Sequence, residues 1–441
     1  MKSRWLLYTT IFATLFAIFL ACPVHDPKDS RYTLVLSQAL LDRRSFKLDG
    51  YFIQRNEQWP THFETSRGHR FYFFPPGSSV LSIPFVVIAN LAGVSAIRPD
   101  RHYDQPSEKM MQAVIASALM AGLGVFMAAI ARDLLPGLWW ILVLAGVELG
   151  SPILSTASRT LWSHTWGVFL VGIAVWMLVR LDGNRGRPHP IFLATLLAWS
   201  YFVRPTNSLS LLGISLYVLA CQRQILWPYL MTVAGWLAAF VAYSWYYFRQ
   251  PLPSYYQGKQ LLSGQPLNGL IANVLSPSRG VLVFVPTLFL VGYLIFRYWH
   301  CVPHRRLVPL ALGILVIHLA AASLNWEWWA GHSYGPRFLT CMMPWFALLA
   351  ILGIRAMLDA RNAGATPAPI QRWENVFGAA ALTVSIAMNC FGAISPAADL
   401  WNFLPEDIDS NPSRVFSARR AQFLAGFYID PTTTPGAESS Q

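Results

Sequence analysis

The segment NWEWWAGHSYGPRFLT, residues 325–340, places several polar side chains between two long apolar runs. Its guanidinium group, at Arg337, stays charged and offers paired donors that match a phosphate. Glu327, His332 and Tyr334 are candidates for further contacts to the same ligand. The three tryptophans of the segment fit an interfacial belt or a sugar-binding platform. We expect this connection to form one wall of a polar site.

Three further arginines stand in short connections of a similar kind, each beside proline, glycine or serine. They are Arg159 in STASRTLWSHTW, Arg204 in FVRPTNS and Arg279 in LSPSRGVLVF. Any one of them could cap a helix C-terminus or pair with a carboxylate. Four guanidinium groups in separate loops on one face instead favour a shared anionic ligand, with phosphate as the preferred partner.

The composition indicates that these loops connect membrane-spanning helices. The 441 residues are 54% hydrophobic and 12% charged, and the mean hydropathy is +0.40. A soluble chain would carry about 25% charged residues. The net charge of +12 is spread over short loops rather than gathered in a stripe, so no nucleic-acid partner is expected. The five cysteines show no paired spacing, and neither a disulfide framework nor a zinc site is predicted.

The fold class predicted is an all-α polytopic membrane protein with about eleven transmembrane helices. The apolar segments are 4–22, 110–131, 139–155, 163–180, 191–203, 206–221, 226–248, 281–298, 307–324, 338–357 and 374–394. The run 78–97 is read as a juxtamembrane or re-entrant helix. This choice places most loop arginines on the cytoplasmic side, as the positive-inside rule requires. The short segments on either side of FVRPTN leave a shallow helical hairpin as an alternative there.

On this topology one domain, 1–394, carries its long loops on the outer face. The first outer loop is 23–109 and the second is 249–280, where Tyr256 and Lys259 are candidate ligand contacts. Residues 395–441 form an outer-face tail, and its end, PTTTPGAESSQ, is predicted to be disordered.

The first outer loop begins with two carboxylates, Asp26 and Asp29, at the exit of the first span. A helix of about three turns is predicted from Tyr32, and its apolar side could lie on the membrane surface. A carboxylate at this boundary can act as general base toward a hydroxyl. The alternative is that Asp29 caps the helix N-terminus.

These pieces resemble the GT-C superfamily of integral-membrane glycosyltransferases, which includes protein O-mannosyltransferases and lipid A aminoarabinose transferases. The likeness rests on the acid after the first span, on FYFFPPGSSVLSIPF (71–85), and on Ser158–Arg159 after a later span. The phrases RPTN, LSPSRGVLVFVP and WWAGHSYGPRF are similar to bacterial members described as mannosyltransferase-like. The resemblance runs from residue 1 to about 345.

The resemblance implies a bacterial cytoplasmic-membrane enzyme whose active site faces outward. Its donor would be a sugar on a polyprenyl phosphate, and its acceptor a hydroxyl of a lipid, glycan or protein. The base of an inverting displacement would fall on Asp29, with Asp26 as the alternative. Where metal-dependent members have a second acidic motif, this chain offers His164, so no obligatory divalent metal is expected. A polymerase or ligase of polyprenyl-diphosphate glycans, or a transporter, are the alternatives.

Overall fold

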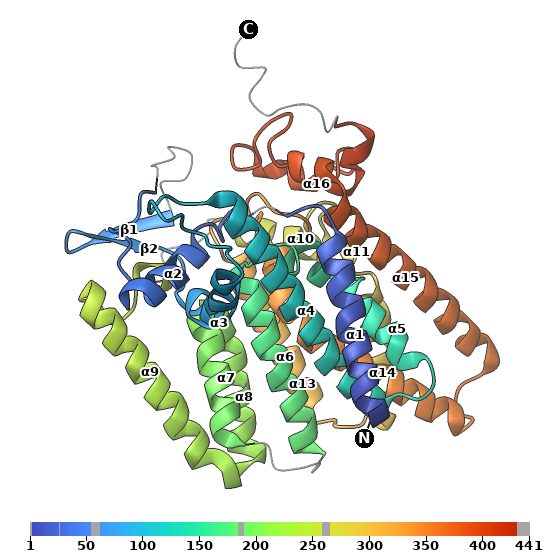
Figure 1. Cartoon of the computed structure of the whole chain (residues 1–441). Coiled ribbons are helices and arrows are strands. Elements are labelled where there is room, and N and C mark those ends of the chain that lie inside the picture. Colours follow the sequence, from blue (N-terminus) through green and yellow to red (C-terminus); the bar gives the residue numbers. More distant parts are fainter. Residues whose placement is uncertain (1, 26, 54–61, 184–188, 258–264, 430–441) are drawn as a thin grey trace.

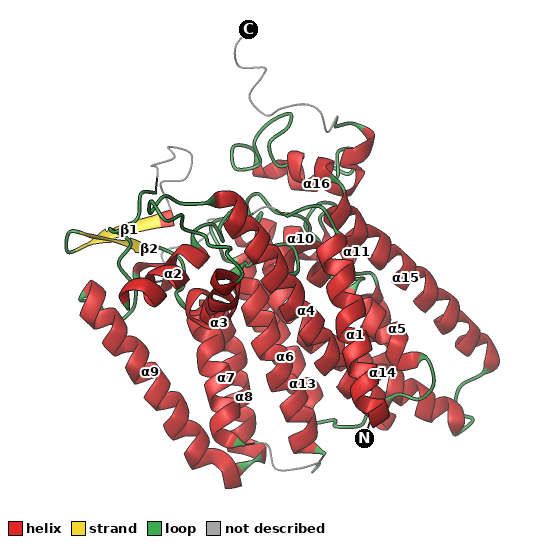
Figure 2. Cartoon of the chain, in the orientation of Figure 1, coloured by secondary structure: helices red, strands yellow, loops and turns green. Residues whose placement is uncertain are grey.

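The computed structural model describes the chain except residues 1, 26, 54–61, 184–188, 258–264 and 430–441. The all-α polytopic class is confirmed (Figure 2). Within the described residues, six helices are long and apolar enough to cross a membrane. They contain α1 (Lys2–Ala21), α4 (Gln105–Leu134), α6 (Ser163–Asp182), α9 (Leu226–Phe248), α14 (Met343–Asn362) and α15 (Ala368–Ile394).

The other five predicted spans are also helical but shorter. They correspond to α5 (Trp139–Glu148), α7 (Pro190–Val203), α8 (Ser208–Cys221), α12 (Thr287–Arg297) and α13 (Leu307–Ser323). Proline explains two of the early breaks, because it removes a backbone donor and clashes with the preceding turn. Helix α5 stops before Pro152 and a π-helical turn, Ile153–Ala157, follows. The predicted span 281–298 is divided at Pro286 into α11 (Val281–Phe284) and α12.

The long connections gather at one end of the bundle, opposite the start of α1 (Figure 1). We call this end the loop face. It carries α2 (Thr33–Arg43), α3 (Gly77–Leu91), α10 (Pro266–Leu275) and α16 (Pro396–Leu400). An unpredicted hairpin also lies there, in which β1 (Phe63–Ser66) pairs antiparallel with β2 (His69–Tyr72). Its turn uses Arg67 and Gly68 at positive φ, which suits a tight hairpin.

Helix α2 has the predicted length, but protein rather than the membrane surface surrounds its apolar side. Its residues from Thr33 to Ala39 are all buried, so the expectation that it lies on the membrane surface is wrong. Helix α3 packs against α2 and α7. At its first residue, Gly77, an added Cβ would come within 2.6 Å of the Phe202 backbone in α7. This close approach fixes the end of α7, and Arg204 follows directly.

Residues 395–429 fold into a compact C-terminal cap over the loop face. The cap contains α16 and two 3-10 turns, Pro412–Phe416 and Gln422–Phe427. Trp401 is fully buried at its centre, packed with Trp328 and Trp329 of the 325–336 connection. These two tryptophans are therefore core residues, and neither a belt nor a sugar platform, whereas Trp326 is 51% exposed. The predicted disordered end, residues 431–441, lies outside the described residues.

Candidate active site at the loop face

Asp29 and Arg337, 308 residues apart in sequence, form an ion pair at the loop face. Asp29 does not cap α2, because Tyr32 occupies the N-cap position and Glu108 accepts the backbone N–H of Leu34 in the first turn at 2.9 Å. Burial alone would raise the pKa of the Asp29 carboxyl, but the Arg337 guanidinium outweighs it and holds that pKa below its usual value. The Asp29 side chain is 37% exposed. It is therefore both ionised at neutral pH and reachable.

The Arg337 guanidinium is held in place from several sides. It lies over the ring of Trp162, with 3.8 Å between the guanidinium carbon and the ring centroid. Its Nη1 donates to the Ala330 carbonyl at 3.4 Å. The chain can fold back to offer that carbonyl because Ala330, Gly331 and Gly335 adopt positive φ, which two glycines do without strain. The Nε atom is buried and has no acceptor in the described chain.

Arg204 supplies a second buried guanidinium on the same side of the site. It follows α7, is 8% exposed, and donates from Nη1 to the Ser163 hydroxyl at 2.9 Å. Within the described residues its Nε has no acceptor and it forms no ion pair with a carboxylate. The neighbouring His164 is fully buried, and its Nε2 also lacks a partner in the described chain.

Unpartnered buried donors carry a cost. Burying a donor without an acceptor costs about 1–3 kcal/mol of hydration free energy, and burying a charged donor costs more. Arg204, Arg337 and His164 therefore mark a place prepared for an anion or for ordered water. The two guanidinium groups both act electrostatically on His164, which places all three in one neighbourhood.

Two cavities flank the ring of Trp162, which lines both. The first is partly open to solvent and contains Asp29, Arg337, Ser163 and Tyr255. Four hydroxyl groups complete its wall: Ser30, Thr33, Tyr72 and Ser78. The second is lined by Lys28 of the first loop, by Ser155, Thr156 and Arg159 in and after the π-helical turn, by His332 of the 325–336 connection and by Asp399 of the cap.

Two of the four predicted arginines are engaged by the protein itself. Arg279 is 1% exposed and donates to the carbonyls of Trp329, Ser278 and Gly331 and to the side chains of Asn402 and Gln422. Burial, with nearby positive charge, lowers its pKa to about 9. Arg159 donates to the carbonyls of Phe19 and Cys22 at the end of α1. Both fit the helix-capping or structural alternative, so neither offers free donors to a phosphate.

Two predicted tyrosines also serve packing. The hydroxyl of Tyr334 donates to the Met388 carbonyl, and that of Tyr256 donates to the Phe202 carbonyl, both at 2.7 Å. Tyr255, the residue before Tyr256, lines the first cavity instead. Two predicted residues, Asp26 and Lys259, lie outside the described residues.

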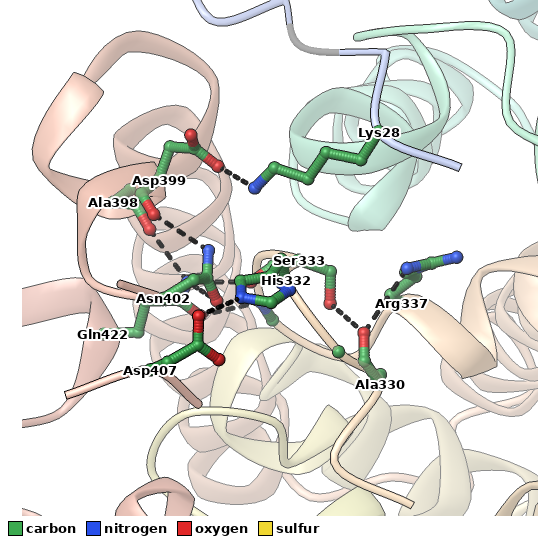
Figure 3. A network of polar contacts seen from close by, with 12 residues as sticks. Lys28, Ala330, His332, Ser333, Arg337, Ala398, Asp399, Asn402, Asp407 and Gln422 are labelled. Atoms are coloured by element: carbon green, nitrogen blue, oxygen red, sulfur yellow. Dashed lines mark hydrogen bonds and ion pairs between the residues drawn. The ribbon is translucent and has the colours of Figure 1, made fainter. Parts of the chain in front are cut away.

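Glu327 and His332 lie near the Asp29–Arg337 pair but differ in their contacts. Burial, together with the charge of Asp29, raises the pKa of Glu327 to about 7. The ring nitrogens of His332 lie 2.9 Å from Asp407 and 3.3 Å from Asp409. Figure 3 shows this contact on one side of Arg337, with Lys28 pointing at Asp399 of the cap.

The structure adds site residues that sequence reasoning missed. Trp162 and Ser163 belong to the SRTLWSHTW stretch, in which only Arg159 and His164 were predicted to contact the ligand. Lys28 stands beside Asp29, and its side chain is 5% exposed. No sequence pattern in the cap predicted its contact with the first loop, because the cap consists mainly of short 3-10 turns without a recognisable periodicity.

No protein-family model matches this chain, and no curated protein matches its sequence. In overall structure the chain is similar to the crystal structure of ArnT from Cupriavidus metallidurans in the apo state. The TM-score is 0.48 and the sequence identity is 11%, over 91% of this chain and 80% of that one.

Proposed function

We propose that this protein is a membrane glycosyltransferase. It would move a sugar from a polyprenyl-phosphate donor to a hydroxyl of a lipid, glycan or protein, at the outer face of a bacterial cytoplasmic membrane. One observation carries the proposal. Arg337, buried and with an unpartnered Nε in the described chain, forms an ion pair with Asp29, and Arg204, whose Nε is also unpartnered there, donates to Ser163 in the wall of the same cavity. Such a transfer needs a binding site for the donor phosphate next to a general base for the acceptor hydroxyl.

The donor phosphate would bind between Arg204 and Arg337. As the bond from the sugar's anomeric carbon to the phosphate oxygen breaks, negative charge grows on that oxygen. Two guanidinium groups, whose residues are each only 8% exposed, would stabilise this charge more strongly than water would. The proposed chemistry needs no general acid and no obligatory cofactor. The leaving group departs as a phosphate, and the two guanidinium groups would neutralise its negative charge.

Asp29 would accept the proton of the acceptor hydroxyl as its oxygen attacks the anomeric carbon. A single displacement of this kind inverts the carbon. Arg337 connects the two steps, since a bound phosphate competes with Asp29 for its guanidinium. Donor binding would loosen the ion pair, raise the basicity of the carboxylate and prepare it for proton transfer.

A lipid-linked donor also needs room for its tail. A groove with an almost entirely apolar lining runs between α5, α12, α14 and α15. Its wall includes Ser151, just before the π-helical turn whose Ser155 and Thr156 line the second polar cavity. An isoprenoid chain in this groove would therefore end close to the second cavity, which shares the Trp162 ring with the first.

Deletion of the gene provides the test. Mass spectrometry of surface glycans and glycolipids should reveal one missing sugar, restored by the wild-type chain. Arg204→Ala should fail to restore it. Arg132→Ala, which removes an exposed arginine at the end of α4 away from the loop face, is the matched control and should restore it. An unchanged glycan profile in the deletion strain, or full restoration by Arg204→Ala, would contradict the proposal.

A further inference from the structure

His332 has a carboxylate at each of its ring nitrogens. Its Nε2 lies 2.9 Å from Oδ2 of Asp407, and its Nδ1 lies 3.3 Å from Oδ2 of Asp409. The ligand atoms of the three side chains all lie within 4.8 Å of one another. Other histidines of the described chain that pair with an aspartate meet one carboxylate each: His69, His102 and His304.

The two carboxylates are held in position by contacts behind them. The indole Nε1 of Trp329 donates to Oδ1 of Asp409 at 2.7 Å. The backbone N–H of Asp409 donates to Oδ1 of Asp407 at 2.8 Å. Each aspartate thus uses Oδ1 within the protein and turns Oδ2 toward His332. Fixed outer contacts of this kind orient the ligands of metal ions.

From the described residues, positive charge reaches the cluster only from a distance, through Arg279 toward Asp409 and Arg414 toward Asp407. Within the described part of the chain, neither aspartate forms an ion pair with lysine or arginine. With a neutral imidazole, two carboxylates stand together at side-chain exposures of 40% and 44%, where an ion could enter from solvent. A combination of one imidazole and carboxylate oxygens suits zinc or manganese, whereas calcium prefers oxygen ligands alone.

We propose that this cluster binds one divalent cation of the zinc class. The direct ligands are Nε2 of His332 and Oδ2 of Asp407, and water completes the coordination. Zinc bonds of about 2.0–2.2 Å place two ligand atoms roughly 3.3 Å apart, so the present separation needs only a small adjustment. Asp409 accepts the Nδ1–H and fixes the ring, as a carboxylate behind a ligating histidine does.

The ion would join two separate parts of the loop face. His332 belongs to the connection that positions Arg337, and Asp407 belongs to the C-terminal cap (Figure 3). Binding therefore fastens the cap to the wall of the candidate active site. This role is independent of the glycosyl-transfer proposal, because the cation contacts neither Asp29 nor the phosphate site.

The test uses the full-length protein in nanodiscs, stripped with a chelator and titrated with Zn²⁺ or Ca²⁺. Isothermal titration and metal analysis should give about one tightly bound zinc per chain, little calcium binding, and a rise in melting temperature with zinc. Asp407→Asn, which keeps the side-chain shape, and His332→Ala should each lose the zinc and the thermal shift. His304→Ala removes a histidine that pairs with a single carboxylate, Asp182, and should retain both.

The inference is overturned if the wild-type protein takes up no zinc, or if Asp407→Asn binds it as well as the wild type. A third result would also overturn it: no zinc uptake, with a rise in stability below pH 7 that His332→Ala abolishes and Glu327→Gln leaves in place. That outcome would identify the cluster as an ion pair made by protonated His332.

Discussion

Replacing Asp29 with asparagine separates catalysis from donor binding. Asparagine keeps the shape of the side chain and an oxygen that can accept from Arg337, but it cannot accept a proton from a hydroxyl at neutral pH. The carboxylate is 37% exposed, so the lost ion pair should cost only about 1 kcal/mol of folding free energy. The variant should therefore fold and insert normally.

The effect on turnover should be large. A positioned general base contributes roughly 10²–10⁴-fold to the rate, which corresponds to about 3–5 kcal/mol of the activation barrier. Affinity for undecaprenyl phosphate should stay the same or increase, because Arg337 loses the carboxylate that competes with the phosphate. Donor consumption in proteoliposomes and binding of undecaprenyl phosphate by thermophoresis measure the two effects.

Asp49→Asn is the matched control, since Asp49 also pairs with a side chain of the first loop but lies 42% exposed beside His69. It should leave both measurements unchanged. The reasoning would be refuted if Asp29→Asn retained turnover within about threefold of the wild type, well inside the range expected for a base. It would also be refuted if the variant lost undecaprenyl phosphate binding.

Three further predictions follow from the packing and charges around the site. Trp162→Ala removes the ring stacked on a guanidinium, a contact worth about 1–2 kcal/mol, and should weaken undecaprenyl phosphate binding about 5- to 30-fold, whereas Trp162→Phe should weaken it less. Gly77→Ala places a Cβ 2.6 Å from the Phe202 backbone and should lower the melting temperature, while Gly292→Ala, with nothing within 4 Å of the added atom, should not. Glu327, with its pKa raised to about 7, makes the folded state bind more protons than the unfolded state above pH 4.5. Stability should therefore fall by up to about 2–3 kcal/mol as the pH rises from 4.5 to 7, and Glu327→Gln should flatten that part of the stability profile measured by denaturant unfolding.

The helices were predictable because apolar length dominates the local signal. Each predicted span contains a helix, and the divided span at Pro286 shows where a local backbone constraint overrides hydropathy. The hairpin was missed because its strands have four residues each, too few for a period-two pattern to stand out.

The site was predictable where chemistry and topology agreed, and not elsewhere. The acid after the first span and the arginine of GPRF do meet, as their shared face suggested. Arg159 and Arg279 look the same in sequence, yet their donors go to backbone carbonyls of α1 and of the 325–336 connection. Such contacts depend on which segments, distant in sequence, pack against each other in the fold. The residues around each arginine do not reveal that packing.

A structure of the protein with bound undecaprenyl phosphate tests the central claim most directly. The phosphate should lie between Arg204 and Arg337, within hydrogen-bond distance of both guanidinium groups, with the Asp29–Arg337 contact loosened. A phosphate bound elsewhere on the protein, with Arg204 and Arg337 unchanged, would contradict the account.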